Sequence, residues 1–122
     1  MSADDRLLPA QDQWHRVIVP DGAEFDWSGF RIGDCQFHLE PLLTNTASRR
    51  AVLLLRDEKP VGYLGEPVAT YMHHELLRLS RIGVRVLVEG RVVSHGDHFA
   101  LYRCVNRAQM ERWVDAQVGR TR

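Results

Sequence analysis

The chain has 122 residues, of which 44% are hydrophobic and 26% are charged, with 16 basic and 16 acidic side chains. This length and composition predict one soluble globular domain that is large enough to bury a core of its own. No apolar run approaches the roughly 18 residues of a membrane span, and the acidic start does not resemble a signal peptide. We therefore expect a cytoplasmic protein.

The charges are unevenly distributed along the chain. Residues 1–48 carry three arginines against eight acids (net −5), whereas residues 49–122 carry 13 basic side chains against eight acids (net +5). This asymmetry indicates a basic working face. Cys35 and Cys104 show no CxxC spacing, so we expect two thiols in a reducing compartment rather than a disulfide.

The first part of the chain predicts a tail, two strands and a loop. Residues 1–13 are polar and acidic without a period, which is typical of a loose tail. Residues 14–19 form an expected strand that ends at the turn sequence of residues 20–22. In residues 31–43, Cys35, Phe37 and Leu39 alternate with polar side chains, which predicts a second strand with one apolar face. A polar loop, residues 44–50, follows.

The aromatic residues Phe25, Trp27 and Phe30 lie between these two strands. Three aromatic side chains within six residues have two possible roles. They can pack at one end of a core, or they can form an exposed surface on which bases stack.

The centre of the chain predicts a hairpin followed by a helix. Two short apolar runs within residues 51–65 flank the polar residues 57–60, the pattern of a β-hairpin. Pro67 suits the first helical position. Val68, Met72, Leu76 and Leu79 then recur on one helix face, and Gly83 stands where a left-handed residue would end the helix.

The last third predicts a second hairpin and a second helix. Residues 84–94 alternate strongly, with Gly90 as a candidate bend or bulge, and residues 99–104 return as the paired strand. Asn106 caps a final helix with Gln109 as its capping-box partner. The whole pattern predicts a mixed α+β, mainly β fold. We expect a small, partly open SH3-like or OB-like barrel of five to six strands over residues 14–119, with one inserted helix, a C-terminal helix and a short tail at 120–122.

The sequence lacks the common catalytic motifs: it has no GxSxG, Walker loop, GxGxxG or HExxH. His95 and His98 have metal-ligand spacing but no third ligand nearby. We therefore expect no enzyme, no cofactor and no metal site. Arginines that hold phosphates and aromatic rings that stack on bases are what single-strand binding requires. A nucleic-acid surface is thus predicted from Trp27, Phe30, Asn45, Arg49, Arg50, Tyr63, Arg91 and Arg103.

An ordered set of short motifs resembles the HIRAN domain family. The set comprises Gly33, the strand end His38-Leu39-Glu40-Pro41, a loop with Asn45, Ala51-Val52 and Pro60-Val61-Gly62-Tyr63-Leu64, followed by a helix and a glycine. The resemblance covers residues 29–104 and implies a small β-barrel that binds DNA, including the free 3′ end of a single strand. Stand-alone bacterial and phage members also occur. The family's loop usually reads Asn-Pro-Tyr-Asp and helps to hold the DNA end. Here the Tyr and Asp are missing, the only counterpart is a displaced asparagine, Asn45, and Arg49 and Arg50 end the loop instead, so the resemblance implies the fold more strongly than 3′-end recognition.

Two hypotheses follow. The first is a non-catalytic module that binds nucleic acid, with single-stranded DNA or DNA ends favoured. The alternative is a protein-interaction domain that keeps the barrel but has lost the DNA surface. Arginines gathered on one concave face favour nucleic acid, whereas arginines that each pair with an acid favour a protein partner. The sequence does not predict the oligomeric state.

Overall fold

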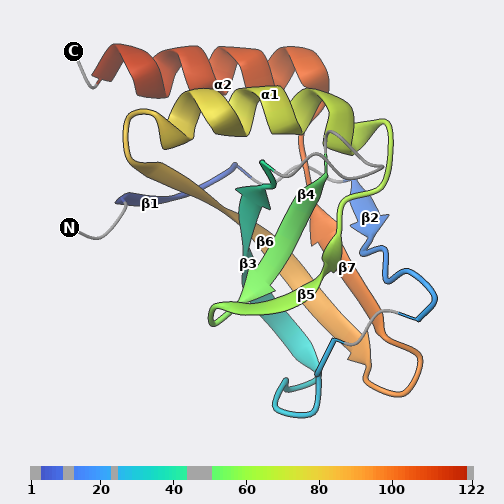
Figure 1. Cartoon of the computed structure of the whole chain (residues 1–122). Helices are drawn as coiled ribbons and strands as arrows, with labels where there is room; N and C mark the ends of the chain where they lie inside the picture. Colours follow the sequence, from blue (N-terminus) through green and yellow to red (C-terminus); the bar gives the residue numbers. More distant parts are fainter. Residues whose placement is uncertain (1–3, 10–12, 23–24, 44–50, 121–122) are drawn as a thin grey trace.

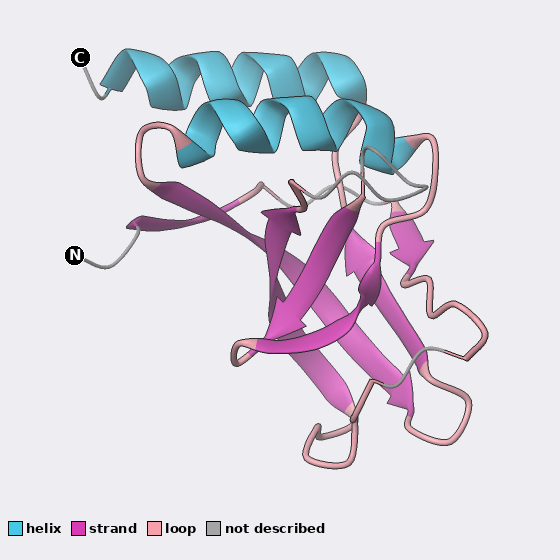
Figure 2. Cartoon of the chain, in the orientation of Figure 1, coloured by secondary structure: helices cyan, strands magenta, loops and turns pink. Residues whose placement is uncertain are grey.

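A computed structural model describes residues 4–9, 13–22, 25–43 and 51–120 (Figure 1). The elements follow the order β-β-β-β-β-α-β-β-α. The strands are β1 (Asp4–Leu7), β2 (Trp14–Arg16), β3 (Gly33–Pro41), β4 (Val52–Arg56), β5 (Lys59–Tyr63), β6 (Val84–Ser94) and β7 (Phe99–Arg103). The helices are α1 (Val68–Ser80) and α2 (Arg107–Arg120). The two helices lie side by side across one end of the sheet (Figures 1 and 2).

Six of the strands form one curled antiparallel sheet in the order β2-β7-β6-β3-β4-β5. Beyond the end of β2, Ile18 forms an isolated antiparallel bridge with Tyr63 of β5, with both N–H···O distances at 2.8 Å. The two edges of the sheet therefore approach each other and enclose the core as a half-barrel. The expected mixed fold class, with one helix inserted between strands and another at the C-terminus, is confirmed.

The central hairpin has the shape that its sequence predicts. Asp57 and Glu58 connect β4 to β5 with φ of 51° and 66°, the left-handed backbone of a type I′ two-residue turn. Between Leu54 and Leu55 of β4 the partner shifts from Gly62 to Pro60, so the extra residue, Val61, lies in β5, and β5 bends as it crosses the half-barrel.

The long strand β6 forms the centre of the sheet. Val84, Val86, Val88 and Val92 all face the core with at most 4% of their surface exposed. Gly90 completes this inward row, but the irregularity in β6 lies between Val92 and Ser94 rather than at the glycine. A Cβ at Gly90 would stand 2.3 Å from Cε2 of Phe37. The glycine is thus needed to make room for the Phe37 ring, and the expected bend at Gly90 is wrong.

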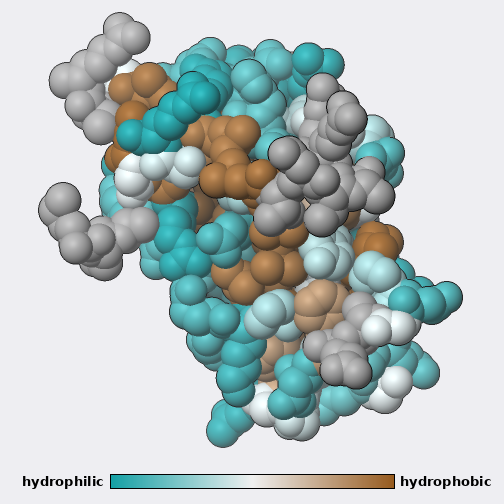
Figure 3. Space-filling view, viewed as in Figure 1, coloured by the Kyte–Doolittle hydropathy of each residue, from teal (hydrophilic) through white to brown (hydrophobic). Residues whose placement is uncertain are grey.

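Both helices cover the core through the predicted apolar faces. Val68, Met72, Leu76 and Leu79 of α1 are buried. Pro67 is the N-cap, one residue before the first helical position, and Gly83 has a φ of 75° after the helix ends. In α2, Asn106 Oδ1 accepts the Gln109 N–H at 2.9 Å and Gln109 Oε1 accepts the Asn106 N–H at 3.1 Å, which confirms the capping box. Figure 3 shows a hydrophilic outer surface on the helices and hydrophobic residues below them, toward the sheet.

The N-terminal segment is not a loose tail where the structure describes it. Asp4–Leu7 pairs in parallel with β6 from Val84 to Leu87, along a stretch of the β6 edge that β7 does not cover. Leu8 is 2% exposed within the main core. Arg6 donates to Oε1 of the buried Gln117 on α2 at 2.6 Å. The predicted boundary at residue 13 is therefore wrong, because residues 4–9 belong to the folded domain.

Within the described residues, no helix combines the length and the apolar character that crossing a membrane requires.

Candidate functional site

Trp27 and Phe30 lie in the core rather than on a stacking surface. They are 2% and 5% exposed, and their ring centroids are 6.3 Å apart. Trp27 donates its indole N–H to the Val61 carbonyl at 3.0 Å, and His98 packs against it edge-on at 5.0 Å. Neither ring can stack on a base in this conformation, so the packing role is the one that the structure shows.

Tyr63 is half-buried and contacts Phe25 edge to face, with ring centroids 5.9 Å apart. Its backbone forms the bridge to Ile18 that brings the two edges of the sheet together. Asn45, Arg49 and Arg50 lie outside the described residues.

Arg91 and Arg103 come together on the outer face of the sheet around a tryptophan that the sequence interpretation missed. Their guanidinium carbons lie 5.2 Å and 4.8 Å from the ring centroid of Trp14 on β2. Strand pairing sets this arrangement, because Trp14 is opposite Arg103, Glu89 is opposite Gln36, and Arg91 is opposite both Leu101 and Asp34. We call this surface the Trp14 face; it consists of Trp14, Asp34, Gln36, Glu89, Arg91, Leu101 and Arg103.

Each of the two arginines on the Trp14 face pairs with a carboxylate. Arg91 Nε is 2.7 Å from Asp34 Oδ1, and Arg103 Nη1 is 3.3 Å from Glu89 Oε2. A phosphate that approached either arginine would also meet a carboxylate of its own sign. Both arginines of the predicted set that the structure describes therefore pair with acids.

A different concave site lies where β2, β7 and the first turns of both helices meet. It is a pocket of about 410 Å³, here called the His15 pocket. Its lining comes from Gln13, His15, Arg16, Ile18, Gly65, Glu66, Pro67, Val68, Tyr71, Tyr102, Asn106 and Arg107. Sheet pairing places His15 directly opposite Tyr102, and the Ile18–Tyr63 bridge holds the chain beside Gly65.

The His15 pocket combines stacked rings with arginines. The His15 and Tyr102 rings stack with centroids 5.4 Å apart and an interplanar angle of 24°. Tyr102 is 1% exposed, so His15 is the ring of this stack that a ligand can reach. Tyr71 donates its hydroxyl to the Val105 carbonyl at 2.6 Å, and burial raises the pKa of both Tyr71 and Tyr102. Both phenols therefore stay protonated near neutral pH.

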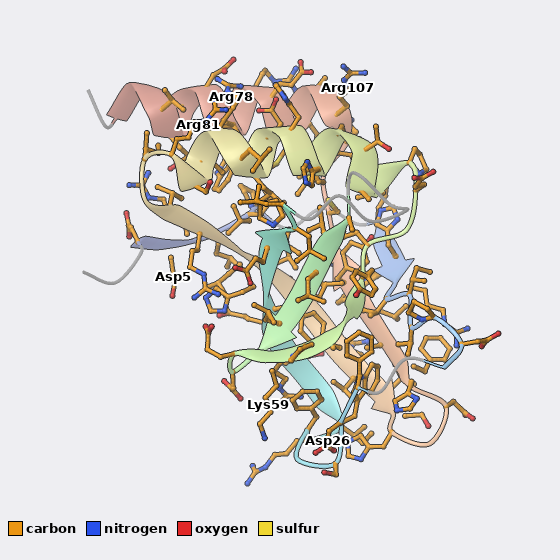
Figure 4. All side chains as sticks on the ribbon, viewed as in Figure 1. Asp5, Asp26, Lys59, Arg78, Arg81 and Arg107 are labelled. Carbon is orange, nitrogen blue, oxygen red and sulfur yellow. The ribbon has the colours of Figure 1, made fainter. Side chains whose placement is uncertain are left out.

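Arg16 and Arg107 are the arginines of the pocket lining. Arg16 is opposite Leu101 of the outer sheet face, and its guanidinium lies 4.3 Å from the ring centroid of Phe99, so Arg107 supplies the cationic group of the pocket. Arg107 extends from the first turn of α2, where Figure 4 labels it, and pairs with Glu111 at 3.2 Å. Glu66 adds one negative charge to the lining. The arrangement suits a flat ring that carries an anionic group.

Sequence reasoning missed His15, Arg16, Tyr71 and Arg107. His15 and Arg16 belong to a three-residue strand, and Tyr71 and Arg107 lie on helix faces beside ordinary packing residues. Only the pairing of β2 with β7 and the start of both helices near this strand end bring them to one pocket. Counting arginines or aromatic residues along the sequence does not reveal that these side chains line the same pocket.

The two cysteines lie outside the lining of the His15 pocket; Cys104 is buried and Cys35 is half-buried. Burial raises the pKa of the Cys104 thiol to about 11 and also raises that of the half-buried Cys35. Cys104 Sγ is 3.7 Å from Met72 Sδ. Among residues 4–9, 13–22, 25–43 and 51–120, no three histidine, cysteine or acidic side chains gather as a candidate metal site.

Comparisons with known proteins gave no match to a family model, to a curated protein or to a solved structure. The HIRAN resemblance thus rests on the sequence motifs given above.

Proposed function

We propose that this domain is a non-catalytic module that binds the terminal nucleotide of a single-stranded nucleic acid, with single-stranded DNA favoured, in the His15 pocket. The observation that carries this proposal is that the accessible ring of a His15–Tyr102 stack lines one pocket together with Arg107, whose side chain is 77% exposed. Stacking on a histidine ring accommodates any base, and exposed guanidiniums bind phosphate oxygens.

The volume of the pocket favours binding of the end of a single strand over binding of a duplex. A volume of about 410 Å³ falls within the range of roughly 300–1,000 Å³ typical of small-ligand sites. One nucleotide at the end of a strand can enter such a space after it leaves the base stack. The HIRAN resemblance implies DNA binding and in that respect agrees with this proposal. Asn45, Arg49 and Arg50 are proposed as further phosphate and sugar contacts on sequence grounds.

The experiment is fluorescence anisotropy across a salt series with a short DNA strand labelled at its 5′ end. We expect binding by the parent protein that weakens steeply with salt. Arg107→Ala should lower the slope of log affinity against log salt by roughly one unit, because one phosphate contact is lost. His15→Ala should cost about 1–3 kcal/mol of binding with little change in the salt slope.

Arg81→Ala is the matched control, because Arg81 is an exposed arginine beyond the other end of α1 (Figure 4). The Arg49→Ala/Arg50→Ala protein tests the sequence-based contacts in the same series. A strand with a blocked 3′ end and a blunt duplex distinguish end binding from binding along the strand. If the parent does not bind single strands at about 50 mM salt, where phosphate contacts are strong, or if Arg107→Ala behaves like Arg81→Ala, the proposal is wrong.

A second candidate function has its own observation. The carboxylates that pair with Arg91 and Arg103 favour a protein partner on the Trp14 face. This surface is separate from the proposed nucleic-acid pocket, and one domain can use both.

A further inference from the structure

We propose that the Trp14 face is a self-complementary interface that joins two copies of this chain about a twofold axis. The face holds Trp14 at the meeting point of two arginines, and each arginine has an acid from a neighbouring strand beside it. A shallow hollow of about 430 Å³ opens there, lined by Trp14, Asp34, Gln36, Glu89, Arg91 and Arg103 among others.

The arrangement of positive and negative charges on the Trp14 face indicates which kind of partner can bind there. Among the residues that the structure describes, Asp34 and Glu89 supply negative charge and Arg91 and Arg103 supply positive charge within this one patch. A uniformly negative partner surface, such as a phosphate backbone or an anionic membrane, would place Asp34 and Glu89 against charges of the same sign. A twofold interface places one patch against an identical patch, so a contact from one residue to a second residue of the other copy is repeated in the opposite direction across the axis. A patch that carries both signs can then match its positive charges with negative charges of the other copy.

The energetics allow the ion pairs to be exchanged between copies. The Arg91 and Asp34 side chains are 50% and 76% exposed, so their pair is a surface ion pair that contributes little to the stability of the monomer. Its replacement by the same pair across an interface therefore costs little. The gain comes from the removal of the Trp14 ring and the arginine stems from water. Tryptophan and arginine are the side chains most enriched at the energetic centres of protein interfaces.

The test is a set of charge reversals followed by sedimentation equilibrium from micromolar to millimolar protein. The parent should dimerise reversibly. Arg91→Glu and Asp34→Arg should each weaken self-association by about tenfold or more, since each variant opposes like charges across the axis. A mixture of these two variants should restore association as a heterodimer. The Asp34→Arg/Arg91→Glu chain should self-associate again, because both pairs are restored with reversed polarity.

Trp14→Ala should weaken the dimer in the same assay, whereas Arg81→Ala, remote from the face, should leave it unchanged. A parent that stays monomeric over the whole concentration range overturns the proposal. A dimer that is insensitive to either single reversal overturns it as well, as does a mixture of reversals that fails to associate. Because Arg107 and His15 are left intact in every variant, nucleic-acid binding in the His15 pocket is measured independently of this outcome.

Discussion

Two strand glycines occupy positions where a side chain would collide with a neighbour. A Cβ at Gly90 would lie 2.3 Å from Phe37 Cε2. A Cβ at Gly62 would lie 2.6 Å from Val17 Cγ1 and 2.7 Å from the Ile18 carbonyl oxygen. The first glycine makes room for the buried Phe37 ring, and the second lets β5 approach the chain at Ile18. The bridge that holds one wall of the His15 pocket therefore depends on the absence of a side chain at Gly62.

Gly90→Ala tests the close packing in the centre of the sheet. The added methyl must displace a fully buried phenyl ring, so we expect a loss of about 1–3 kcal/mol in the free energy of unfolding, measured by urea denaturation. Gly96→Ala is the control, because no atom lies within 4 Å of the position of its Cβ, and it should change stability by no more than about 0.5 kcal/mol. Equal effects from both substitutions would show that the Phe37 ring can move aside.

At the scale of single elements, the predictions from periodicity succeeded where an element packs one apolar face. The alternation of β6 and the stripe of α1 each specify a face, and both elements occur close to the expected limits. The strand β1 was missed because Asp4, Asp5 and Arg6 carry no such alternation, and its parallel partner lies far away in sequence. The short polar strand β1 forms because β6 offers an unpaired edge, and the sequence pattern of β1 itself does not reveal that edge.

The candidate site was less predictable than the fold, for a related physical reason. The sequence patterns distinguish buried from exposed positions but do not specify which exposed side chains meet. The aromatic cluster and the count of arginines directed attention to Trp27 and Phe30, which are buried in the core, and to Arg91 and Arg103, which pair with acids. His15, Arg16 and Tyr71 come together through strand pairing and helix placement. No spacing within the chain encodes that contact.

The docking of β1 gives a prediction at this scale. Leu8 is 2% exposed in the core, whereas Leu7, its neighbour, is 42% exposed on the surface. Leu8→Ala should therefore lower the free energy of unfolding by about 2–5 kcal/mol, since it leaves a cavity, and Leu7→Ala should cost no more than about 1 kcal/mol. The measurement is urea denaturation of the two variants side by side. Similar small losses would mean that β1 is only loosely held on the edge of β6.

At the scale of the whole molecule, the sheet and the helix layer share one core. A single buried cluster runs from Leu8 of the N-terminal segment, through the sheet and α1, to Val114 of α2. Arginines tie the same layers together at the surface. Arg78 of α1 contacts Glu75 at 2.8 Å and Asp115 of α2 at 2.7 Å, while Arg6 of β1 contacts Gln117 of α2. No boundary within the described residues divides this core into parts that could unfold separately.

A shared core predicts that the helix layer and the sheet unfold in one cooperative transition. Trp27 packs against Phe30, His98 and the Val61 carbonyl, so its fluorescence reports on the packed interior of the half-barrel. The chain has three tryptophans, and Trp14→Phe/Trp113→Phe leaves Trp27 as the only one. Far-ultraviolet circular dichroism of the same protein reports mainly on α1 and α2. Because a domain of this size without an internal boundary unfolds in a two-state manner, both signals should give the same urea midpoint and the same dependence on urea. Loss of the helical signal at a lower urea concentration than the Trp27 signal would show that the helices form a separate, weaker unit. The His15 pocket, which depends on the first turns of both helices, would then open before the sheet unfolds.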